Sequence, residues 1–307
     1  MIGIVGAGAF GSALAVSLAQ NGPVTLWGRG AAAWAETRRA PRLPGTCLPD
    51  NVTITDSLSD LGAADALLLC VPMQQLAAVL PALPPTGAPR VACCKGIELT
   101  TGRDAAQILS DHSAEPAAIL TGPSFAADIA RLLPTALTLA CADDAAGQTL
   151  QRSLTTPNLR LYRSSDTRGA ALGGALKNVI AIACGAAMGA GYGPSARAAI
   201  MTRGFAELQR YALARGAEPE TLAGLSGFGD LTLTCTDAQS RNYQLGLALG
   251  QGIPFDPAIT VEGAATAAAL RTAPGMPITQ TVAALIAGDT TTTDAMRALM
   301  ARPLKEE

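Results

Sequence analysis

Brief apolar runs alternate with helix-like stretches over the first half of the chain. The runs contain few polar positions, and we expect each to be a β-strand: Ile2 to Val5, Val24 to Trp27, Val52 to Thr55, Ala66 to Val71, Val91 to Cys94, Ala118 to Thr121 and Ala136 to Ala140. A strand with one solvated face alternates polar and apolar residues, whereas a strand buried on both faces is apolar throughout. Buried strands separated by helices predict an α/β fold with a mostly parallel, doubly wound Rossmann-type sheet.

The pattern changes after Tyr162. Strand signals nearly vanish, and long Ala- and Leu-rich helical patterns separated by Gly and Pro continue to the end. We expect one helix over Leu172 to Met188. A second is expected to begin near Ser195, as its N-cap, and to end around Arg215 and Gly216. The second half is therefore predicted to be an all-α domain.

The length and composition agree with a division into two domains. The chain has 307 residues, of which 49% are hydrophobic and 15% charged, and this is more than one compact unit usually holds. We predict a dinucleotide-binding domain over residues 1–164 and a helical substrate-binding domain over residues 165–307. The active site is expected in a cleft between them.

The charge balance bears on partners and location. The net charge is −2 and the pI is near 5.5, so neither a nucleic acid nor an anionic membrane is an expected partner. Charges, Gly and Pro interrupt the apolar segments, and we expect no membrane insertion. Because the first strand begins at Met1 and Ile2 with no leader before it, we expect a cytoplasmic protein. The sequence does not define the oligomeric state; a homodimer is one arrangement we consider.

The cysteines do not form a recognisable framework. They are odd in number, lie mostly in apolar runs and lack CxxC spacing or His partners: Cys47, Cys70, Cys93, Cys94, Cys141, Cys184 and Cys235. We interpret them as reduced core residues, with a metal site or a disulfide framework as the less favoured alternative. No metal is expected in the active site.

A glycine-rich motif follows the first strand directly. In this motif Gly6 permits a tight turn, Gly8 allows the backbone to approach a pyrophosphate, and Gly11 allows close packing of helix against strand. Ala9 and Phe10 complete the loop, and a helix-forming run follows it. The helix N-terminus attracts an anion. We predict a dinucleotide site with contacts from all five residues; the alternative is a structural glycine-rich turn.

The second strand leads into Gly28 and Arg29, where a strict NAD enzyme usually places Asp or Glu to bind the ribose hydroxyls. Arg29 can instead bind the 2′-phosphate of NADP. The alternative is an exposed loop arginine. We therefore expect NADP to be favoured, with NAD also possible as the cofactor.

Several further motifs share an order and spacing that point to one family. They are Lys95-Gly-Ile-Glu98, Gly122-Pro-Ser124-Phe-Ala126, Gly174-Ala-Leu-Lys177-Asn178, Gly227-Phe-Gly-Asp230-Leu-Thr-Leu-Thr234, Ser240-Arg241-Asn242 and Val261-Glu262-Gly263. Together with the glycine-rich loop, from residue 2 to about residue 280, the chain resembles bacterial NAD(P)-dependent glycerol-3-phosphate dehydrogenase. The resemblance implies a reduction of dihydroxyacetone phosphate to sn-glycerol 3-phosphate, a precursor of glycerophospholipids.

The resemblance also implies the catalytic residues, which are Lys177, Lys95 and Asp230. A lysine in a run as apolar as that around Lys177 is costly to bury unless it faces a cleft, so the residues independently mark it as functional. The alternative is a lysine that reaches the surface. Two ammonium groups converging on one substrate lower each other's pKa, which suits proton transfer near neutral pH, and a carboxylate offsets part of their charge. His112, the only histidine, lies in a polar stretch and is expected in a solvated loop.

The remaining contacts are implied by the same resemblance. Substrate contacts fall on Lys95, Gly122, Ser124, Asn178, Asp230, Thr234, Ser240, Arg241 and Asn242, where a small phosphorylated substrate would meet the guanidinium fork of arginine. Asn178 and Thr234 have an alternative role in capping or core hydrogen bonds. Cofactor contacts fall on Lys95, Ala126, Arg241 and Glu262, besides Arg29 and the glycine-rich loop.

The chain departs from the family pattern in two places, and two other functions stay open. Cys93 and Cys94 precede Lys95 where a small hydroxyl residue is common, and plain Ala and Thr residues follow Gly263. A related NADP-dependent reductase of a 3-hydroxy acid would share the nucleotide loop and the lysine helix but would not need Ser240-Arg241-Asn242. A non-catalytic NADP-binding sensor would not need Lys177 and Asp230 together.

Overall fold

The structure is a computed structural model that describes residues 1–112 and 114–300. The chain divides into two compact units. Unit 1 consists of Met1–Lys95 and Ala105–Ala171, and unit 2 of Gly96–Asp104 and Leu172–Glu307. Residues 301–307, which the predicted second domain included, lie outside the described part. Each unit has its own hydrophobic core.

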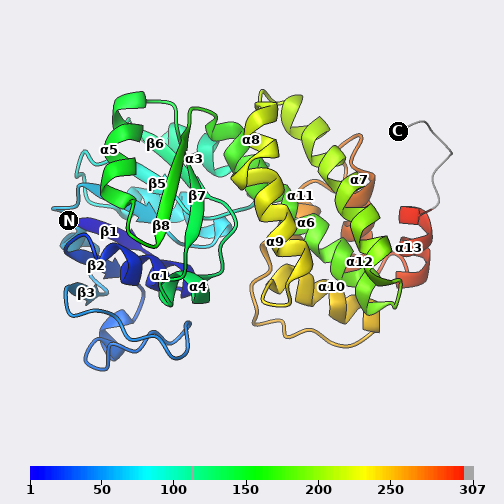
Figure 1. Cartoon of the computed structure of the whole chain (residues 1–307), viewed down its shortest axis with the longest axis horizontal. Coiled ribbons are helices and arrows are strands. Elements are labelled where there is room, and N and C mark those ends of the chain that lie inside the picture. Colours follow the sequence, from blue (N-terminus) through cyan, green and yellow to red (C-terminus); the bar gives the residue numbers. More distant parts are fainter. Residues whose placement is uncertain (113, 301–307) are drawn as a thin grey trace. The chain divides into compact units, whose positions relative to one another are not determined.

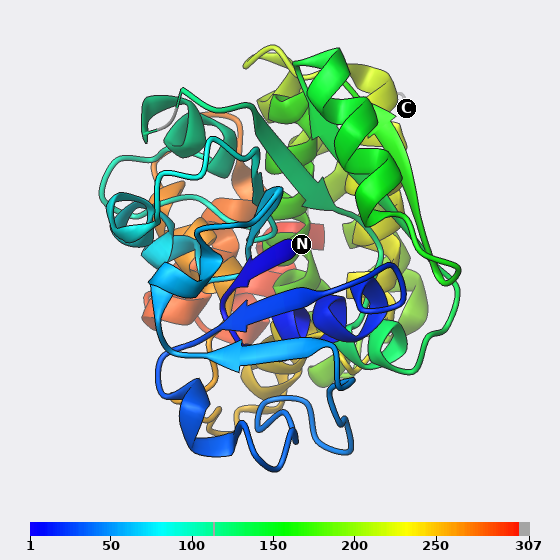
Figure 2. The same cartoon turned by 90° about the vertical axis from the view of Figure 1, so that its left-hand side faces the viewer.

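Unit 1 is built on an eight-stranded sheet in the order β3-β2-β1-β4-β5-β6-β7-β8. The strands are β1 (Ile2–Val5), β2 (Val24–Trp27), β3 (Val52–Thr55), β4 (Ala66–Leu69), β5 (Arg90–Ala92), β6 (Ala117–Thr121), β7 (Thr135–Cys141) and β8 (Leu159–Ser164). All neighbours are parallel except β6 and β7. Strands β1 to β3, in shades of blue, point the same way in Figure 2. The predicted mostly parallel α/β fold is confirmed.

Helices cover both faces of this sheet, which explains the uninterrupted apolar runs. Ile4 and Leu68 point to one face, while Val5 and Leu69 point to the other, and all four are fully buried. The helices of unit 1 are α1 (Ala9–Leu18), α2 (Leu76–Val79), α3 (Ala105–His112), α4 (Ala126–Ala130) and α5 (Asp144–Leu154). Helices α1, α4 and α5 supply residues to the core cluster that contains Ile4 and Leu68. Helices α2 and α3 supply residues to the cluster that contains Val5 and Leu69.

Several local expectations need correction. Strand β8 was not among the expected strands because it alternates. Leu159 and Leu161 are buried, whereas Arg160, Tyr162 and Arg163 are exposed, as in a strand with one solvated face. His112 is not a loop residue: it ends α3, and its ring Nδ1 lies 2.9 Å from the carbonyl of Ile108. Ser195 is not an N-cap, because the helix begins two residues earlier at Gly193, and its N-cap residue is Tyr192.

Unit 2 is helical (Figure 1). Its helices are α6 (Thr167–Gly189, whose first residues belong to unit 1), α7 (Gly193–Leu213), α8 (Pro219–Ala223), α9 (Asp230–Thr236), α10 (Arg241–Gln251), α11 (Glu262–Ala269), α12 (Pro277–Ala287) and α13 (Thr292–Met300). Helix α6 is long and apolar enough to cross a membrane, but it is almost entirely buried. A helix that is apolar all round is typical of a core, which is consistent with a soluble protein.

Glycines let α10 pack directly on α6. A Cβ added at Gly185 of α6 would lie 2.2 Å from the carbonyl oxygen of Tyr243, and one added at Gly189 would lie 2.3 Å from that of Leu247. Gly246 and Gly250 of α10 face α6 with similarly short distances. The backbones of α6 and α10 are therefore in direct contact, with no room for a side chain at these four positions.

Candidate active site

The glycine-rich turn between β1 and α1 can be made only by glycine at two of its positions. Gly6 has a φ of 120°, and a Cβ there would lie 2.7 Å from the carbonyl oxygen of Cys70. A Cβ at Gly11 would lie 2.0 Å from the carbonyl oxygen of Gly6. By contrast, a Cβ at Gly8, the N-cap of α1, would meet nothing within 4 Å. Glycine at this position leaves space beside the helix N-terminus, where a phosphate binds favourably.

Four of the other residues expected to contact the cofactor belong to elements near this turn in unit 1. Ala9 and Phe10 form the first turn of α1, and Ala126 begins α4, which packs against α1. Arg29 follows β2 and is exposed. The preceding glycine packs on Ala7, since a Cβ on Gly28 would lie 2.5 Å from the Cβ of Ala7. Arg29 thus begins its loop next to the glycine-rich turn.

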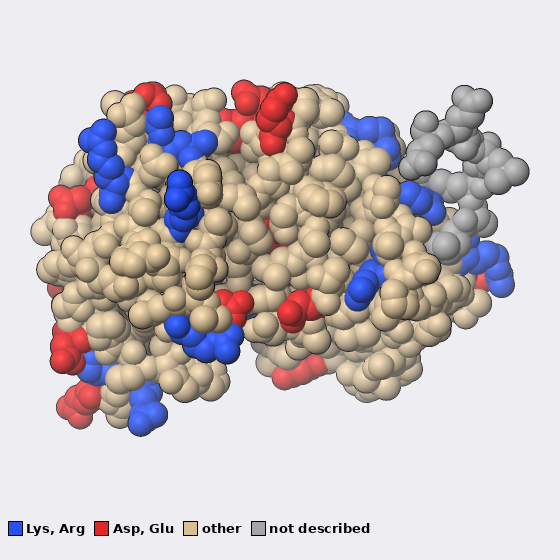
Figure 3. Space-filling view, viewed as in Figure 1, with Lys and Arg blue, Asp and Glu red and all other residues tan. Residues whose placement is uncertain are grey.

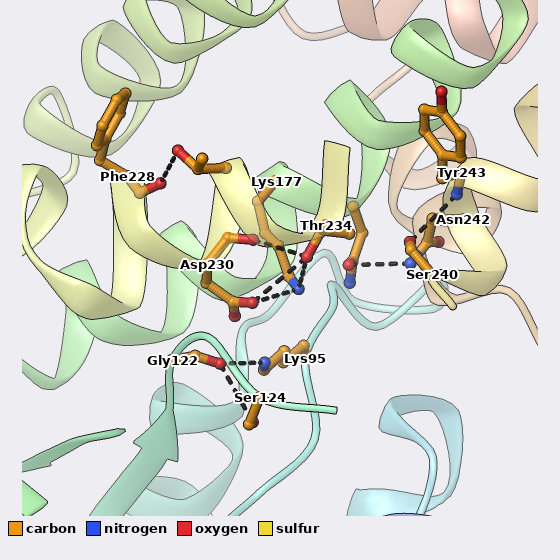
Figure 4. Close-up of polar contacts among 12 residues, drawn as sticks. Lys95, Gly122, Ser124, Lys177, Phe228, Asp230, Thr234, Ser240, Asn242 and Tyr243 are labelled. Atoms are coloured by element: carbon orange, nitrogen blue, oxygen red, sulfur yellow. Dashed lines mark hydrogen bonds and ion pairs between the residues drawn. The ribbon is translucent and has the colours of Figure 1, made fainter. Parts of the chain in front are cut away.

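The carboxyl end of β6 and the loop after β5 bring Lys95 and Ser124 together. The Lys95 ammonium donates to the carbonyl oxygen of Gly122 at 3.2 Å, and the Ser124 hydroxyl donates to the same oxygen at 3.4 Å (Figure 4). Gly122 has a φ of 143°, a conformation that favours glycine. These three predicted substrate contacts therefore form one group at the edge of unit 1.

In unit 2, a buried cluster joins α6 to α9. The Lys177 ammonium donates to the Asp230 carboxylate at 2.7 Å and to the Thr234 hydroxyl at 2.5 Å. Thr234 in turn donates to the backbone carbonyl of Asp230 at 2.7 Å. Lys177 is 6% exposed and Asp230 1%. Figure 4 shows the three side chains pointing toward one another. A charge at this depth is costly unless it is paired, as here.

Cys235 adjoins this cluster without competing for its proton. Burial raises the pKa of the Cys235 thiol well above its ordinary value, the nearby Cys184 adds to the rise, and the Lys177 charge opposes it. The thiol therefore stays protonated at neutral pH. The ion pair of this cluster is the one between Lys177 and Asp230.

A second polar group connects α6, α10 and α11. The Asn242 amide nitrogen donates to the Asn178 carbonyl oxygen at 2.9 Å, and the Asn242 carbonyl oxygen accepts from the backbone N–H of Gly263 at 2.9 Å. Ser240 caps α10, its hydroxyl accepting from the N–H of Tyr243 at 3.2 Å. The side chains expected to bind substrate thus also hold the helices around Lys177 together.

Arg241 and Glu262 occupy the first residues of two helices. Arg241 begins α10 and is exposed, so its guanidinium is available to an anion near the positive end of the helix. Glu262 begins α11, one residue before the Gly263 that bonds to Asn242. Sequence reasoning missed the backbone of Gly263 as a link, although the Val-Glu-Gly motif contains it.

The predicted site residues therefore form groups in both units. The glycine-rich turn, Arg29 and the Lys95 group belong to unit 1, and the Lys177 and Asn242 groups belong to unit 2. A nucleotide-type turn on a doubly wound sheet, combined with a buried lysine–carboxylate pair in a helical unit, is typical of one class of protein: the two-domain dehydrogenases that use a nicotinamide cofactor.

Comparisons with known proteins specify the family. The model of the NAD-dependent glycerol-3-phosphate dehydrogenase N-terminus matches residues 1–147, and the model of the C-terminus matches residues 166–297. The glycerol-3-phosphate dehydrogenase [NAD(P)+] of Ruegeria sp. (strain TM1040) is 58% identical over 100% of this chain and 99% of its own. That of Cereibacter sphaeroides is 56% identical over 100% of both chains.

A solved structure agrees with these matches. The crystal structure of glycerol-3-phosphate dehydrogenase from Coxiella burnetii has a TM-score of 0.91 at 31% identity, covering 98% of each chain. The chain belongs to the NAD-dependent glycerol-3-phosphate dehydrogenase family and is an NAD(P)-dependent oxidoreductase. The resemblance inferred from the motifs is confirmed.

Proposed function

We propose that this chain transfers a hydride between NAD(P)H and dihydroxyacetone phosphate, giving sn-glycerol 3-phosphate, with Lys177 as the proton donor. The observation that carries the proposal is the buried contact of Lys177 with Asp230 and Thr234. Reduction of a ketone adds a hydride to carbon and a proton to oxygen, so the enzyme needs a positioned acid. His112, at the exposed end of α3, does not meet this need.

The glycine-rich turn fits the dinucleotide. The space beside Gly8 and the N-terminus of α1 suit the pyrophosphate, and Arg29 suits the 2′-phosphate that distinguishes NADP from NAD. Ala9, Phe10, Ala126, Arg241 and Glu262 complete the proposed contacts. When bound, the nicotinamide supplies the hydride from its C4 to C2 of the substrate.

Lys177 holds the proton for the C2 oxygen. The bonds from its ammonium to Asp230 and Thr234 hold the amine nitrogen in one position. Asp230 forms an ion pair with this ammonium in its buried position. Lys95, held by the Gly122 carbonyl, adds positive charge that stabilises the developing alkoxide. In the reverse direction Lys177 takes the proton from the alcohol.

The substrate phosphate requires a local anion site, because the net charge of the chain is −2. Arg241 at the start of α10 combines a guanidinium fork with the positive end of a helix dipole. Asn242, Asn178, Ser240, Ser124 and Gly122 are the proposed further contacts. A reductase of a 3-hydroxy acid would have no phosphate to bind at this place.

The product of this reaction has a clear use: we infer that the enzyme supplies glycerol 3-phosphate for glycerophospholipid synthesis. We also propose that it works in the cytoplasm and, through Arg29, prefers NADPH over NADH.

The test is an assay of cofactor oxidation with two candidate substrates. Purified enzyme is mixed with dihydroxyacetone phosphate or with a 3-oxo acid that lacks a phosphate, and with NADPH or NADH. We expect absorbance loss at the nicotinamide band only with dihydroxyacetone phosphate, and a larger kcat/KM with NADPH. Turnover of the 3-oxo acid alone would refute the proposed substrate, and binding of NADPH without any turnover would favour the sensor.

A further inference from the structure

A short π-helical turn, Leu225–Gly229, leads directly into Asp230. Its characteristic bond is that of the Gly229 N–H to the Gly224 carbonyl, at 3.0 Å. Such turns are rare in proteins, and those that occur are often found at functional sites. The extra residue changes the direction of the side chains that follow. Here the side chain that follows is the carboxylate that binds Lys177.

Two glycines let this turn lie against α6 and α8. A Cβ added at Gly173 of α6 would lie 2.8 Å from the carbonyl oxygen of Ser226 and 3.2 Å from the Cα of Gly227. A Cβ added at Gly227 would lie 1.9 Å from the carbonyl oxygen of Leu222. In both cases the obstacle is backbone, which cannot move aside as a flexible side chain can. Neither glycine has a positive φ, so the requirement is for space and not for conformation.

The contact and the ion pair lie on adjoining turns. Gly173 precedes Lys177 by four residues along α6, and Gly227 precedes Asp230 by three. Residues four apart in an α-helix lie on the same face, so Gly173 lies one turn before Lys177 on the same face of α6. The backbone contact of Gly173 with the π-turn therefore fixes the separation of α6 and the start of α9 one turn before Lys177 meets Asp230.

We propose that Gly173 and Gly227 are positioning residues for proton transfer: their close backbone contact sets the distance and direction of the bond between Lys177 and Asp230. The inference rests on the proposed role of Lys177. It predicts that a single methyl group at residue 173, which touches neither substrate nor cofactor in this account, slows the chemical step.

The expected size of the effect follows from the distances. An ordinary contact of a Cβ begins at 3.4 Å, so Gly173→Ala must move the Ser226 carbonyl by several tenths of an ångström from its 2.8 Å position. A misplacement of ~1 Å can slow an enzyme about 100-fold. We therefore expect the rate of hydride transfer to fall roughly ten-fold or more in Gly173→Ala.

A single-turnover experiment separates slower chemistry from loss of folded enzyme. Enzyme in excess over NADPH is mixed with saturating dihydroxyacetone phosphate in a stopped-flow instrument. The amplitude shows whether all the NADPH is oxidised, the rate constant reports the chemical step, and circular dichroism and thermal melting on the same preparation report the folded fraction. Gly173→Ala should keep a near-full amplitude with the reduced rate constant, while NADPH affinity, measured by fluorescence titration, stays within a few-fold because most of the proposed cofactor contacts lie in unit 1.

Gly189→Ala is the matched control. It places the same methyl group on the same helix against a closer backbone atom, the Leu247 carbonyl at 2.3 Å, but three turns beyond Lys177. We expect it to lower the melting temperature at least as much as Gly173→Ala and to leave the rate constant within about two-fold, by the same geometric argument. An equal loss of rate in both variants would overturn the proposal.

Two further variants keep the result decisive. If Gly173→Ala yields no folded protein, Ser226→Ala takes its place, because it removes the bond of the Ser226 hydroxyl to the Thr221 carbonyl at 3.2 Å and loosens the same turn without crowding it. An unchanged rate constant in the variant tested would overturn the proposal. Lys177→Met serves as the reference variant. If Lys177→Met also keeps the wild-type rate constant, the proposed role of Lys177 is wrong. If the rate constant falls sharply in Lys177→Met but not in the glycine or serine variant, only the positioning inference is wrong.

Discussion

Replacement of Lys177 by methionine tests whether Lys177 is the proton donor and how much its ion pair contributes to stability. Methionine keeps much of the apolar stem but removes the ammonium that binds Asp230 at 2.7 Å and Thr234 at 2.5 Å. We expect kcat to fall by about 10²- to 10⁴-fold, the usual effect of losing a positioned acid. That range corresponds to roughly 2.7 to 5.4 kcal/mol of transition-state stabilisation.

The same substitution leaves the Asp230 carboxylate, 1% exposed, without its lysine. Breaking a buried ion pair on one side costs about 3–5 kcal/mol of stability, so Lys177→Met should also melt at a lower temperature. The double variant Lys177→Met, Asp230→Asn removes both charges. It should recover part of the stability while recovering none of the activity.

The assay combines kcat, NADPH affinity by fluorescence titration and thermal melting on the same preparation of each variant. NADPH affinity should stay within a few-fold, because the proposed dinucleotide contacts lie mainly in the turn of unit 1. If Lys177→Met binds NADPH and retains more than about a tenth of the wild-type kcat when chemistry limits the rate, Lys177 is not the donor. Lys95 would then be the next candidate.

Three other substitutions or treatments have definite expected outcomes. Arg29→Asp should move the ratio of kcat/KM values from NADPH toward NADH by at least roughly ten-fold, since a charge-assisted bond contributes about 1.5 to 3 kcal/mol; an unchanged ratio contradicts the assignment. Arg241→Lys keeps the charge but loses the fork and should still raise KM for dihydroxyacetone phosphate, and sulfate should inhibit the wild type more strongly than Arg241→Ala. Equal inhibition would place the phosphate site elsewhere. A disulfide reagent at pH 8 should label exposed Cys47 quickly, whereas Cys93 and Cys235, which are buried and whose pKa values are raised by that burial, should react only after unfolding; rapid labelling of Cys235 would show that the region beside Lys177 opens readily.

Much of the fold could be read from the sequence because burial on both faces leaves a clear signal. The runs at Ile2–Val5 and Val24–Trp27 are strands with the expected bounds. The alternating edge strand Leu159–Ser164 gave a weaker signal, since only Leu159 and Leu161 meet the core. Helix starts were harder to place: Ser195 is a common capping residue type, but Pro194 allowed the helix to begin before it.

The parts of the site that depend on residue type and motif spacing could be predicted from the sequence. The apolar run around Lys177 marked this lysine as functional, and the family resemblance implied Asp230 in the same cluster; the structure pairs the two. The dual use of Asn242 was not predictable, because its bonds to Asn178 and to the backbone of Gly263 depend on the packing of three helices. Nor does any periodicity predict the π-turn before Asp230, which packs closely on backbone at Gly173 and Gly227.

Transfer of a label from cofactor to product tests the central claim most directly. The enzyme is incubated with dihydroxyacetone phosphate and NADPH that carries deuterium at both C4 positions, and the product is examined by mass spectrometry and NMR. Direct hydride transfer predicts sn-glycerol 3-phosphate with one deuterium, bound to C2, and the unlabelled proton on the C2 oxygen. A product without deuterium at C2, or NADPH consumption without glycerol 3-phosphate, would contradict the account.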